Sequence, residues 1–494
     1  MQIIFKKLKK DFLKKEFLFF GLIFALAIFF RFYRAQELYT FELDQDLFSW
    51  IVKDILINHH IRLIGQLTSI DGVFIGPLYY YLLVPFFFIF KMNPSSALIP
   101  AAGISIATIF SIYYVFSKFF GKSTGIIGSL LYSFSLPIIL IDRWVVPTQT
   151  TFLWSIWYLW CLVAIKNGSK KAVLVAGVLV AMIWQVHIAL VPLVFLLPVA
   201  IYLSRKKITL KFYIYSAILF LVFSSPFWLF ELRHNFQQIR GFITATTVTR
   251  DDTNILWRLY LVIGSISIEI NRICVYFITI PWFVSIPVFG GIIFFLKRKK
   301  LFKTSDVYLV GLWILLISFS QFISKRPISD YYFNSLIIPT LLVFSLLLAK
   351  LSERYFVRFI LALLFIALFM FNFISLSKMK SENSFLVKKK LVETIKQDAL
   401  QNNYPCISVT LIADLGTGYG FRYLLWYEGL DVINPAVGIP NYDILVGWDK
   451  YAKDINLKFG YYGLNIPHEQ KFTADKSACS DPKNQPEQLL NFTN

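Results

Sequence analysis

Long apolar runs recur through the first three quarters of this chain, and short clusters of lysine and arginine separate them. Many of these runs approach the length that a helix needs to cross the hydrocarbon core of a bilayer. Hydrophobic residues make up 57% of the sequence, which is more than the interior of a soluble fold can bury. We therefore predict an all-α polytopic membrane protein.

About eleven of the runs are counted as transmembrane helices. The first, 17–32, follows a basic stretch and is not followed by a small-residue cleavage site. We interpret it as an uncleaved helix whose N-terminus lies in the cytoplasm. The other spans are expected at 96–117, 124–141, 150–165, 172–186, 188–203, 212–230, 272–296, 307–324, 333–350 and 357–377.

The basic clusters set the predicted orientation. If the short run Pro77 to Phe90 does not span, the clusters at 118–122, 166–171, 205–207 and 297–300 all face the same side. Positive residues favour the cytoplasmic side, so we predict a multi-pass protein of the cytoplasmic membrane with its C-terminus outside. The same clusters explain the net charge of +20 and favour the lipid bilayer over nucleic acid as a partner.

Three external regions follow from this topology. The loop 33–95 comes first, and the loop 231–271 contains an apolar surface helix at 255–270. Residues 378–494 are less apolar and are expected to form a small C-terminal α/β extracytoplasmic domain, beside a transmembrane domain of residues 1–377. Strands are expected there at 406–412 and 442–447. Cys406 and Cys479 would both lie outside, where a disulfide is permitted.

The loop 33–95 carries three carboxylates within five residues, Glu42, Asp44 and Asp46. Such a cluster beside a membrane is costly unless it is hydrated or functional. An amphipathic helix from Asp46 to His60 is expected to lie on the membrane surface with Asp46 as its N-cap. If Asp46 caps the helix, Asp44 is the carboxylate left free, and we expect it to be the active one.

Further polar residues fall at the outer ends of the predicted spans. Convergence of acids, bases and tyrosines on one face indicates a site there. Beside Asp44 and Asp46, the candidates are Asp142, Arg143, His187, Lys325, Arg326 and Tyr331. Pairing of Asp142 with Arg143 at a helix end, and a purely interfacial role for His187, are equally compatible with the sequence.

These features resemble the GT-C superfamily of membrane glycosyltransferases. The acidic loop, the amphipathic helix and the run Gly76-Pro77-Leu78-Tyr79-Tyr80-Tyr81 resemble its branch of dolichyl-phosphate-mannose–protein mannosyltransferases and lipid-A aminoarabinose transferases. Asp142-Arg143-Trp144 with Pro147, and the stretch from Arg326 to Pro339, resemble the later motifs of that branch. The first-loop motif is Glu-Leu-Asp-Gln-Asp, which departs from the adjacent Asp-Glu of the protein mannosyltransferases. Which acid acts is therefore open.

The resemblance implies transfer of a sugar from a polyprenyl-phosphate-linked donor to an extracytoplasmic acceptor. A carboxylate would act as general base, with Asp44 first and Asp142 as a helper or metal ligand. The phosphate of the sugar donor would be bound by cationic or hydrogen-bond-donating side chains, with Lys325, Arg326, Arg143 and His187 as candidates. Asp46 and Tyr331 would also bind substrate. A site with one base and one group of phosphate-binding residues favours inversion of configuration at the anomeric carbon. No cofactor is specified, and participation of a divalent cation is left open.

Two other classes of protein fit parts of the sequence. A transporter or flippase of lipid-linked sugars would also be polytopic and basic, but usually has charges or broken helices at mid-membrane. The predicted spans are nearly uncharged. A non-catalytic scaffold would not require acids, arginine and histidine on one face. We therefore place the glycosyltransferase hypothesis first and the transporter second.

Overall fold

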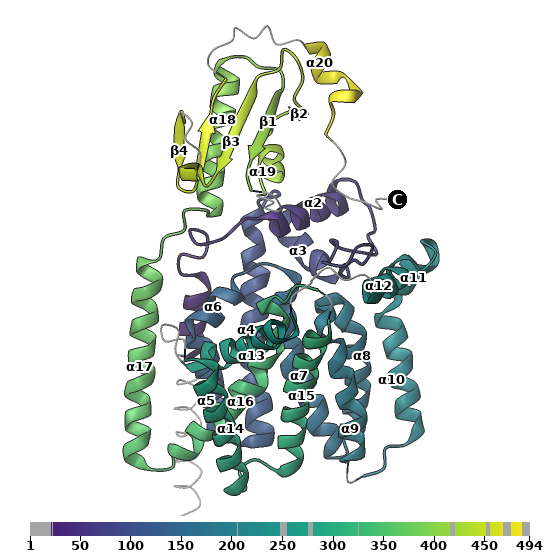
Figure 1. Cartoon of the computed structure of the whole chain (residues 1–494), viewed down its shortest axis with the longest axis vertical. Helices are drawn as coiled ribbons and strands as arrows, with labels where there is room; N and C mark the ends of the chain where they lie inside the picture. The colour runs from purple at the N-terminus through teal and green to yellow at the C-terminus, as the bar shows by residue number, and fades with distance from the viewer. Residues whose placement is uncertain are drawn as a thin grey trace, which may run out of the picture.

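The computed structural model describes residues 21, 23–204, 206–247, 254–274, 280–324, 326–414, 420–450, 455–467 and 476–486. It confirms a mostly helical chain with a small C-terminal sheet domain. Figure 1 shows the long helices running side by side, with the sheet domain beyond one end of the bundle and α2 lying across between the two. The end of the bundle that faces the sheet domain is called the sheet-domain end below.

The apolar pattern predicts the helix positions closely. The helices of the bundle are α4 (Leu98–Phe120), α5 (Lys122–Phe134), α6 (Leu136–Asp142), α7 (Thr151–Lys166), α8 (Lys170–Val186), α9 (Leu196–Tyr202), α10 (Leu210–Phe223), α11 (Ser225–Arg233), α14 (Trp282–Arg298), α15 (Thr304–Ile323), α16 (Ile337–Leu351) and α17 (Tyr355–Lys378). The first apolar run is helical over Ile23–Phe32. The predicted span 272–296 was placed too early, because Pro281 precedes the first turn of α14.

Among the described residues, four helices are long and apolar enough to cross a membrane, or six if each bent pair is one span. The bent pairs are α5 with α6, at 70°, and α10 with α11, at 57°. Proline near the start of α6 and of α11 removes a backbone donor and ends the preceding helix. Three shorter apolar helices accompany them, so the total of about eleven stays a prediction.

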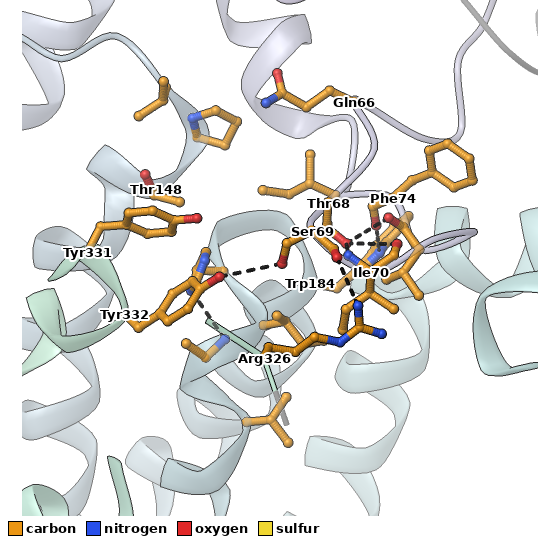
Figure 2. Close-up of a pocket in the computed structure, with 18 of the residues that line it drawn as sticks. Gln66, Thr68, Ser69, Ile70, Phe74, Thr148, Trp184, Arg326, Tyr331 and Tyr332 are labelled. Carbon is orange, nitrogen blue, oxygen red and sulfur yellow. Dashed lines mark hydrogen bonds between the residues drawn. The ribbon is translucent and has the colours of Figure 1, made fainter. Parts of the chain in front are cut away.

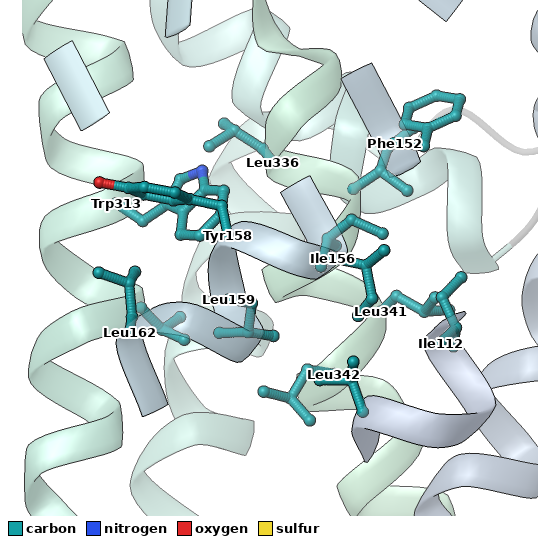
Figure 3. Packing of buried hydrophobic residues seen from close by; sticks show 14 of the residues in the cluster. Ile112, Phe152, Ile156, Tyr158, Leu159, Leu162, Trp313, Leu336, Leu341 and Leu342 are labelled. Atoms are coloured by element: carbon teal, nitrogen blue, oxygen red, sulfur yellow. The ribbon is translucent and has the colours of Figure 1, made fainter. Parts of the chain in front are cut away.

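The bundle core is built around α7. Tyr158, Leu159 and Leu162 of α7 are fully buried and lie close to Trp313 of α15 and Leu341 of α16 in Figure 3. The rings of Tyr158 and Trp313 are 5.7 Å apart in an edge-on arrangement. In a bilayer, van der Waals packing of this kind drives helix association, because lipid tails are as apolar as the side chains.

Two helices outside the bundle complete its sheet-domain end. The short run around Tyr81 forms α3 (Leu78–Ile89), which is about 18 Å long at 1.5 Å per residue and therefore shorter than a bilayer core. The predicted surface helix forms α13 (Ile255–Cys274). Its Val262 and Ile270 are buried against the bundle, whereas Leu256 and Trp257 are exposed.

Within its described residues, the sheet domain contains five strands in the order β2-β1-β3-β5-β4. The strands are β1 (Ile407–Ile412), β2 (Val432–Ile433), β3 (Asn441–Val446), β4 (Leu457–Phe459) and β5 (Tyr462–Asn465). The two predicted strands are β1 and β3, which pair in parallel. Helices α18 (Phe385–Gln401), α19 (Arg422–Tyr427) and α20 (Lys476–Ser480) complete the domain. The disulfide between Cys406 and Cys479 is formed.

The helix α2 (Leu43–Ile57) differs from the sequence prediction in two ways. It begins at Leu43, so Glu42 is its N-cap and Asp46 is not. Phe48 is buried as expected, but Asp46 and Ser49 on the polar face are buried too. The reason is that α2 packs between α3 and α19, so the sheet domain, not water, covers its polar side.

Cysteine labelling tests the membrane orientation. Cysteines placed near Asp44, Asp142 and Arg326 should react with an impermeant reagent added outside, and cysteines at Lys206 and Lys299 should not. Figure 1 shows the α9–α10 and α14–α15 connections, near these two lysines, at the end of the bundle opposite the sheet domain. Outside labelling at Lys299 would contradict the eleven-span topology.

Candidate functional site

A cavity of about 460 Å³ opens at the sheet-domain end of the bundle. Figure 2 shows loop residues on one side and tyrosines on the other. It is lined by residues of five separate segments: the start of α2 and the loop before α3, the stretch between α6 and α7, the junction of α8 with the 3-10 helix η3 (Ile188–Phe195), the end of α15, and the start of the 3-10 helix η4 (Asp330–Leu336). The cavity brings together Asp44, His187, Arg326 and Tyr331, four of the eight predicted site residues.

Asp44 is the one acidic residue among the described residues that line the cavity. It is the second residue of α2, where the helix dipole favours negative charge. Its Oδ1 accepts a hydrogen bond from Gln66 Nε2 at 2.8 Å. Burial raises the pKa of Asp44 above its ordinary value, the Gln66 hydrogen bond opposes that rise, and the nearby Glu42 adds to it. A desolvated carboxylate with a raised pKa is a stronger base than one in water.

The loop that carries Gln66 is held in place by backbone hydrogen bonds and close packing. Gln66 donates its N–H to the hydroxyl of Tyr80 at 3.0 Å, and Tyr80 is fully buried. Trp184 donates from Nε1 to the carbonyl of Phe74 at 2.7 Å. A Cβ at Gly76 would come within 2.1 Å of Gln185 Oε1, which explains why the Gly-Pro motif begins with glycine.

Arg326 is the only arginine or lysine among the described lining residues. Its Nη1 lies 3.5 Å from the carbonyl of Ser69, at the limit of a hydrogen bond. Its buried Nε has no partner within the described part of the chain. Arg258 of α13 donates to the carbonyls of Arg326 and Gln321, at 2.9 and 2.8 Å. The backbone of Arg326 is therefore fixed while its guanidinium keeps donors available for an anion.

An aromatic wall closes the side of the cavity opposite the loop. The His187 ring lies 5.4 Å from the rings of both Tyr331 and Tyr332, and Trp144 is 6.0 Å from Tyr331. His187 Nδ1 accepts the N–H of Ala189 at 3.2 Å, so a neutral ring carries its proton on Nε2 and can donate from there. Tyr332 and Ser69 hydroxyls are 3.4 Å apart and link the wall to the loop.

Asp142 is not among the lining residues of the cavity. It forms a buried ion pair with Arg31 at 2.6 Å, and it also accepts hydrogen bonds from Ser105 and, at 2.8 Å, from Tyr132. Both carboxylate oxygens are thus used within the bundle. A buried charge is tolerated when it is paired and hydrogen-bonded in this way. The role of catalytic helper or metal ligand for Asp142 stays a prediction.

Arg143 and Asp46 also lie away from the lining of the cavity. Arg143 donates to the carbonyls of Phe30 and Tyr33 at the end of the first helix, and it does not pair with Asp142. Asp46 Oδ1 accepts the backbone N–H of Tyr423 at 2.8 Å. Both make contacts within the protein, and substrate binding by either residue stays a prediction. Lys325 lies outside the described residues.

Sequence reasoning missed several residues of the site. Gln66, Ser69 and Trp184 come to the cavity through tertiary packing, and nothing in their local sequence distinguishes them. Arg31 carried a signal, because an arginine inside an apolar helix must find a buried partner. Among the residues that the structure describes, no three histidine, cysteine or acidic side chains lie close enough to hold a metal ion. The participation of a divalent cation therefore stays open.

No protein-family model matches this chain, and no curated protein matches it in sequence. Two crystal structures of ArnT from Cupriavidus metallidurans match it in fold. The structure bound to undecaprenyl phosphate has a TM-score of 0.56 over 90% of this chain and 97% of that chain. The apo structure has a TM-score of 0.59 over 91% and 98%. Sequence identity is 12% in both. The chain therefore shares, over nearly its whole length, the fold of these two ArnT structures.

Proposed function

We propose that this protein is a membrane glycosyltransferase that moves a sugar from a polyprenyl-phosphate-linked donor to an extracytoplasmic acceptor. One observation carries the proposal: Asp44 and Arg326, a base and a phosphate-binding cation, line the same cavity at one end of an ArnT-like bundle. The bound form of ArnT contains undecaprenyl phosphate, and this supports a donor of the same chemical class. The acceptor is a hydroxyl or amine on a lipid, glycan or protein.

In the proposed reaction, Asp44 accepts the proton of the acceptor while the acceptor atom attacks the anomeric carbon. The bond between that carbon and the phosphate oxygen breaks at the same time, and its electron pair leaves with the lipid phosphate. Arg326 stabilises the charge that grows on the phosphate, and neutral His187 supplies a further donor. The cavity has one acid among its described lining residues, which favours a single displacement with inversion because retention needs a second carboxylate.

The aromatic wall suits the sugar. Pyranose rings present apolar C–H faces as well as hydroxyls, so a site for them combines aromatic surface with a few polar groups. Trp144, Tyr331 and Tyr332 supply the surface, and Thr148 and Ser69 supply hydroxyls. The ring of Tyr331 is edge-on to Trp144.

A transfer assay tests the proposal. Purified protein in lipid nanodiscs would be given undecaprenyl-phosphate-linked hexoses and pentoses together with lipid, glycan and peptide acceptors, and products would be detected by mass spectrometry. We expect release of undecaprenyl phosphate and formation of a glycosylated acceptor. Movement of an intact donor across proteoliposomes, with no product from any donor, would favour the transporter hypothesis instead.

The pH profile of the enzyme should report Asp44. The base acts only when ionised, so activity is lost as the pH falls through its pKa. The Gln66 hydrogen bond lowers that pKa because it stabilises the carboxylate. Gln66→Leu should therefore move the acid limb of kcat/KM to higher pH. An unchanged acid limb in this variant would show that the titrating group is not Asp44.

A further inference from the structure

The sheet domain contacts the chain on both sides of Asp44. Residues 39–46, called the docked segment here, follow the first helix and include the first turn of α2. Phe385 donates its N–H to the carbonyl of Tyr39 at 2.7 Å. Beside this bond, Thr40 and Ser384 form an antiparallel β-bridge. An isolated β-bridge thus joins the docked segment to the residue that precedes α18.

Lys388 anchors the same segment from inside the interface. It is fully buried, and its Nζ donates to the carbonyl of Phe41. The ammonium group also lies 5.1 Å from the Phe421 ring centre and 5.5 Å from that of Tyr462. Burial lowers the pKa of Lys388 to about 7, against the effect of the nearby acids. Burying the Lys388 ammonium group costs free energy of desolvation. A gain in stability alone therefore does not explain why this lysine is buried at the interface.

Two more contacts reach the first turn of α2. Asp46 Oδ1 accepts the N–H of Tyr423 at 2.8 Å, at the beginning of α19. Gly420 has a φ of +62°, and a Cβ there would lie 2.5 Å from the carbonyl of Glu42. Only glycine allows the sheet domain to approach the backbone so closely. Contacts at Glu42 and Asp46 therefore bracket Asp44 on both sides.

Because of the helix geometry, these contacts with the sheet domain also determine the position of Asp44. In an α-helix with 3.6 residues per turn, side chains two positions apart are separated by about 200° around the helix axis. Asp46 and Asp44 therefore leave α2 on nearly opposite sides: the first contacts the sheet domain and the second lines the cavity. A rotation or shift of α2 that loosened the sheet-domain contact would move the Asp44 carboxylate by a similar amount.

From these contacts we infer that the sheet domain is part of the catalytic unit, with Lys388 and Asp46 as positioning residues that hold Asp44 in the cavity. This inference rests on the proposed function, because it gives Asp44 the role of base. It assigns a role to the C-terminal domain that its sequence does not suggest. In the proposed function the donor phosphate is bound at the other side of the cavity by Arg326, whose hydrogen bonds with described residues involve Ser69, Arg258 and Ser324 and not the sheet domain.

Lys388→Met keeps the length of the side chain and removes its charge and hydrogen bond. We expect kcat to fall about 10- to 100-fold, because a displacement near 1 Å of a catalytic group has effects of that size. The KM for the donor and the Kd for undecaprenyl phosphate should stay unchanged. Lys389→Met is the matched control, since Lys389 is partly exposed and pairs only loosely with Glu393, at 3.6 Å. It should behave like the wild type.

A covalent link distinguishes positioning from a general folding defect. Thr40 and Ser384 face each other as a non-hydrogen-bonded antiparallel pair, where side chains lie close enough for a disulfide. Introducing Thr40→Cys with Ser384→Cys into the Lys388→Met protein should restore kcat when oxidised, and reduction should remove the rescue. A normal kcat in Lys388→Met, or a loss of kcat that the oxidised pair does not restore, would overturn the inference. Activity retained by Asp44→Asn would instead overturn the proposed base.

Discussion

Asp44→Asn should lower kcat by about two orders of magnitude or more, the usual contribution of a general base. Asparagine has nearly the shape of aspartate, so it can still accept the hydrogen bond from Gln66 Nε2 that holds Asp44 now. What it lacks is basicity. Without a base, the acceptor must attack with its proton in place, and the barrier to forming the new bond rises.

Donor binding separates loss of chemistry from loss of structure. Undecaprenyl phosphate should bind the Asp44→Asn protein with an unchanged Kd, because Asp44 contacts the acceptor and not the phosphate in the proposed reaction. The thermal unfolding temperature should not fall, since removing a desolvated carboxylate removes a cost of folding. Glu42→Gln is the matched control: Glu42 is exposed, two residues away and outside the lining of the cavity. If the control lost activity and Asp44→Asn kept it, the general base would be assigned to the wrong acid.

Arg326→Ala should weaken donor binding by about 2–4 kcal/mol, the range expected for a charge-assisted contact to phosphate in a sheltered site. That corresponds to a rise in Kd for undecaprenyl phosphate of roughly 30- to 700-fold at 1.4 kcal/mol per decade. The physical reason is that the buried Nε of Arg326 has no partner within the described residues. This N–H group is therefore available to donate to the anion.

Arg326→Lys should recover only part of the lost affinity. A planar guanidinium can give two parallel hydrogen bonds to a phosphate, whereas an ammonium acts as a point charge. Arg233→Ala is the control, because Arg233 is exposed and outside the lining of the cavity. Isothermal titration or native mass spectrometry with undecaprenyl phosphate measures all three variants. A Kd that is unchanged in Arg326→Ala would remove Arg326 from the phosphate site.

The local sequence was sufficient to predict those helices and strands whose formation depends on the local pattern of residues. The apolar runs predict most helices of the bundle, because a segment in lipid must satisfy its backbone hydrogen bonds internally. The alternating segments around Val409 and Ile444 predict β1 and β3. The cysteines of the C-terminal domain form the disulfide that the predicted topology permits. Errors at the ends of elements have local causes too, as with Pro281 before α14.

The choice among the acids needed the tertiary structure. Asp44, Asp46 and Asp142 all follow apolar segments and all looked suitable. The Asp142 carboxylate accepts hydrogen bonds from Arg31, Ser105 and Tyr132. These residues come from three helices that only tertiary packing brings together. In the sequence, Asp142 has Arg143 beside it, and no local signal indicates that Arg31, more than a hundred residues earlier, is its partner.

The sequence by itself determined that this is a helical membrane protein with a sheet domain, and that a carboxylate follows its first helix. It did not determine where that carboxylate points. The first turn of α2 begins at Leu43, not at Asp46, and a helix sends side chains two residues apart to nearly opposite sides. Asp46 consequently meets Tyr423 of the sheet domain and Asp44 meets Gln66 at the cavity. Both contacts join segments far apart in the chain, and contacts of that kind exist only after the whole chain has folded.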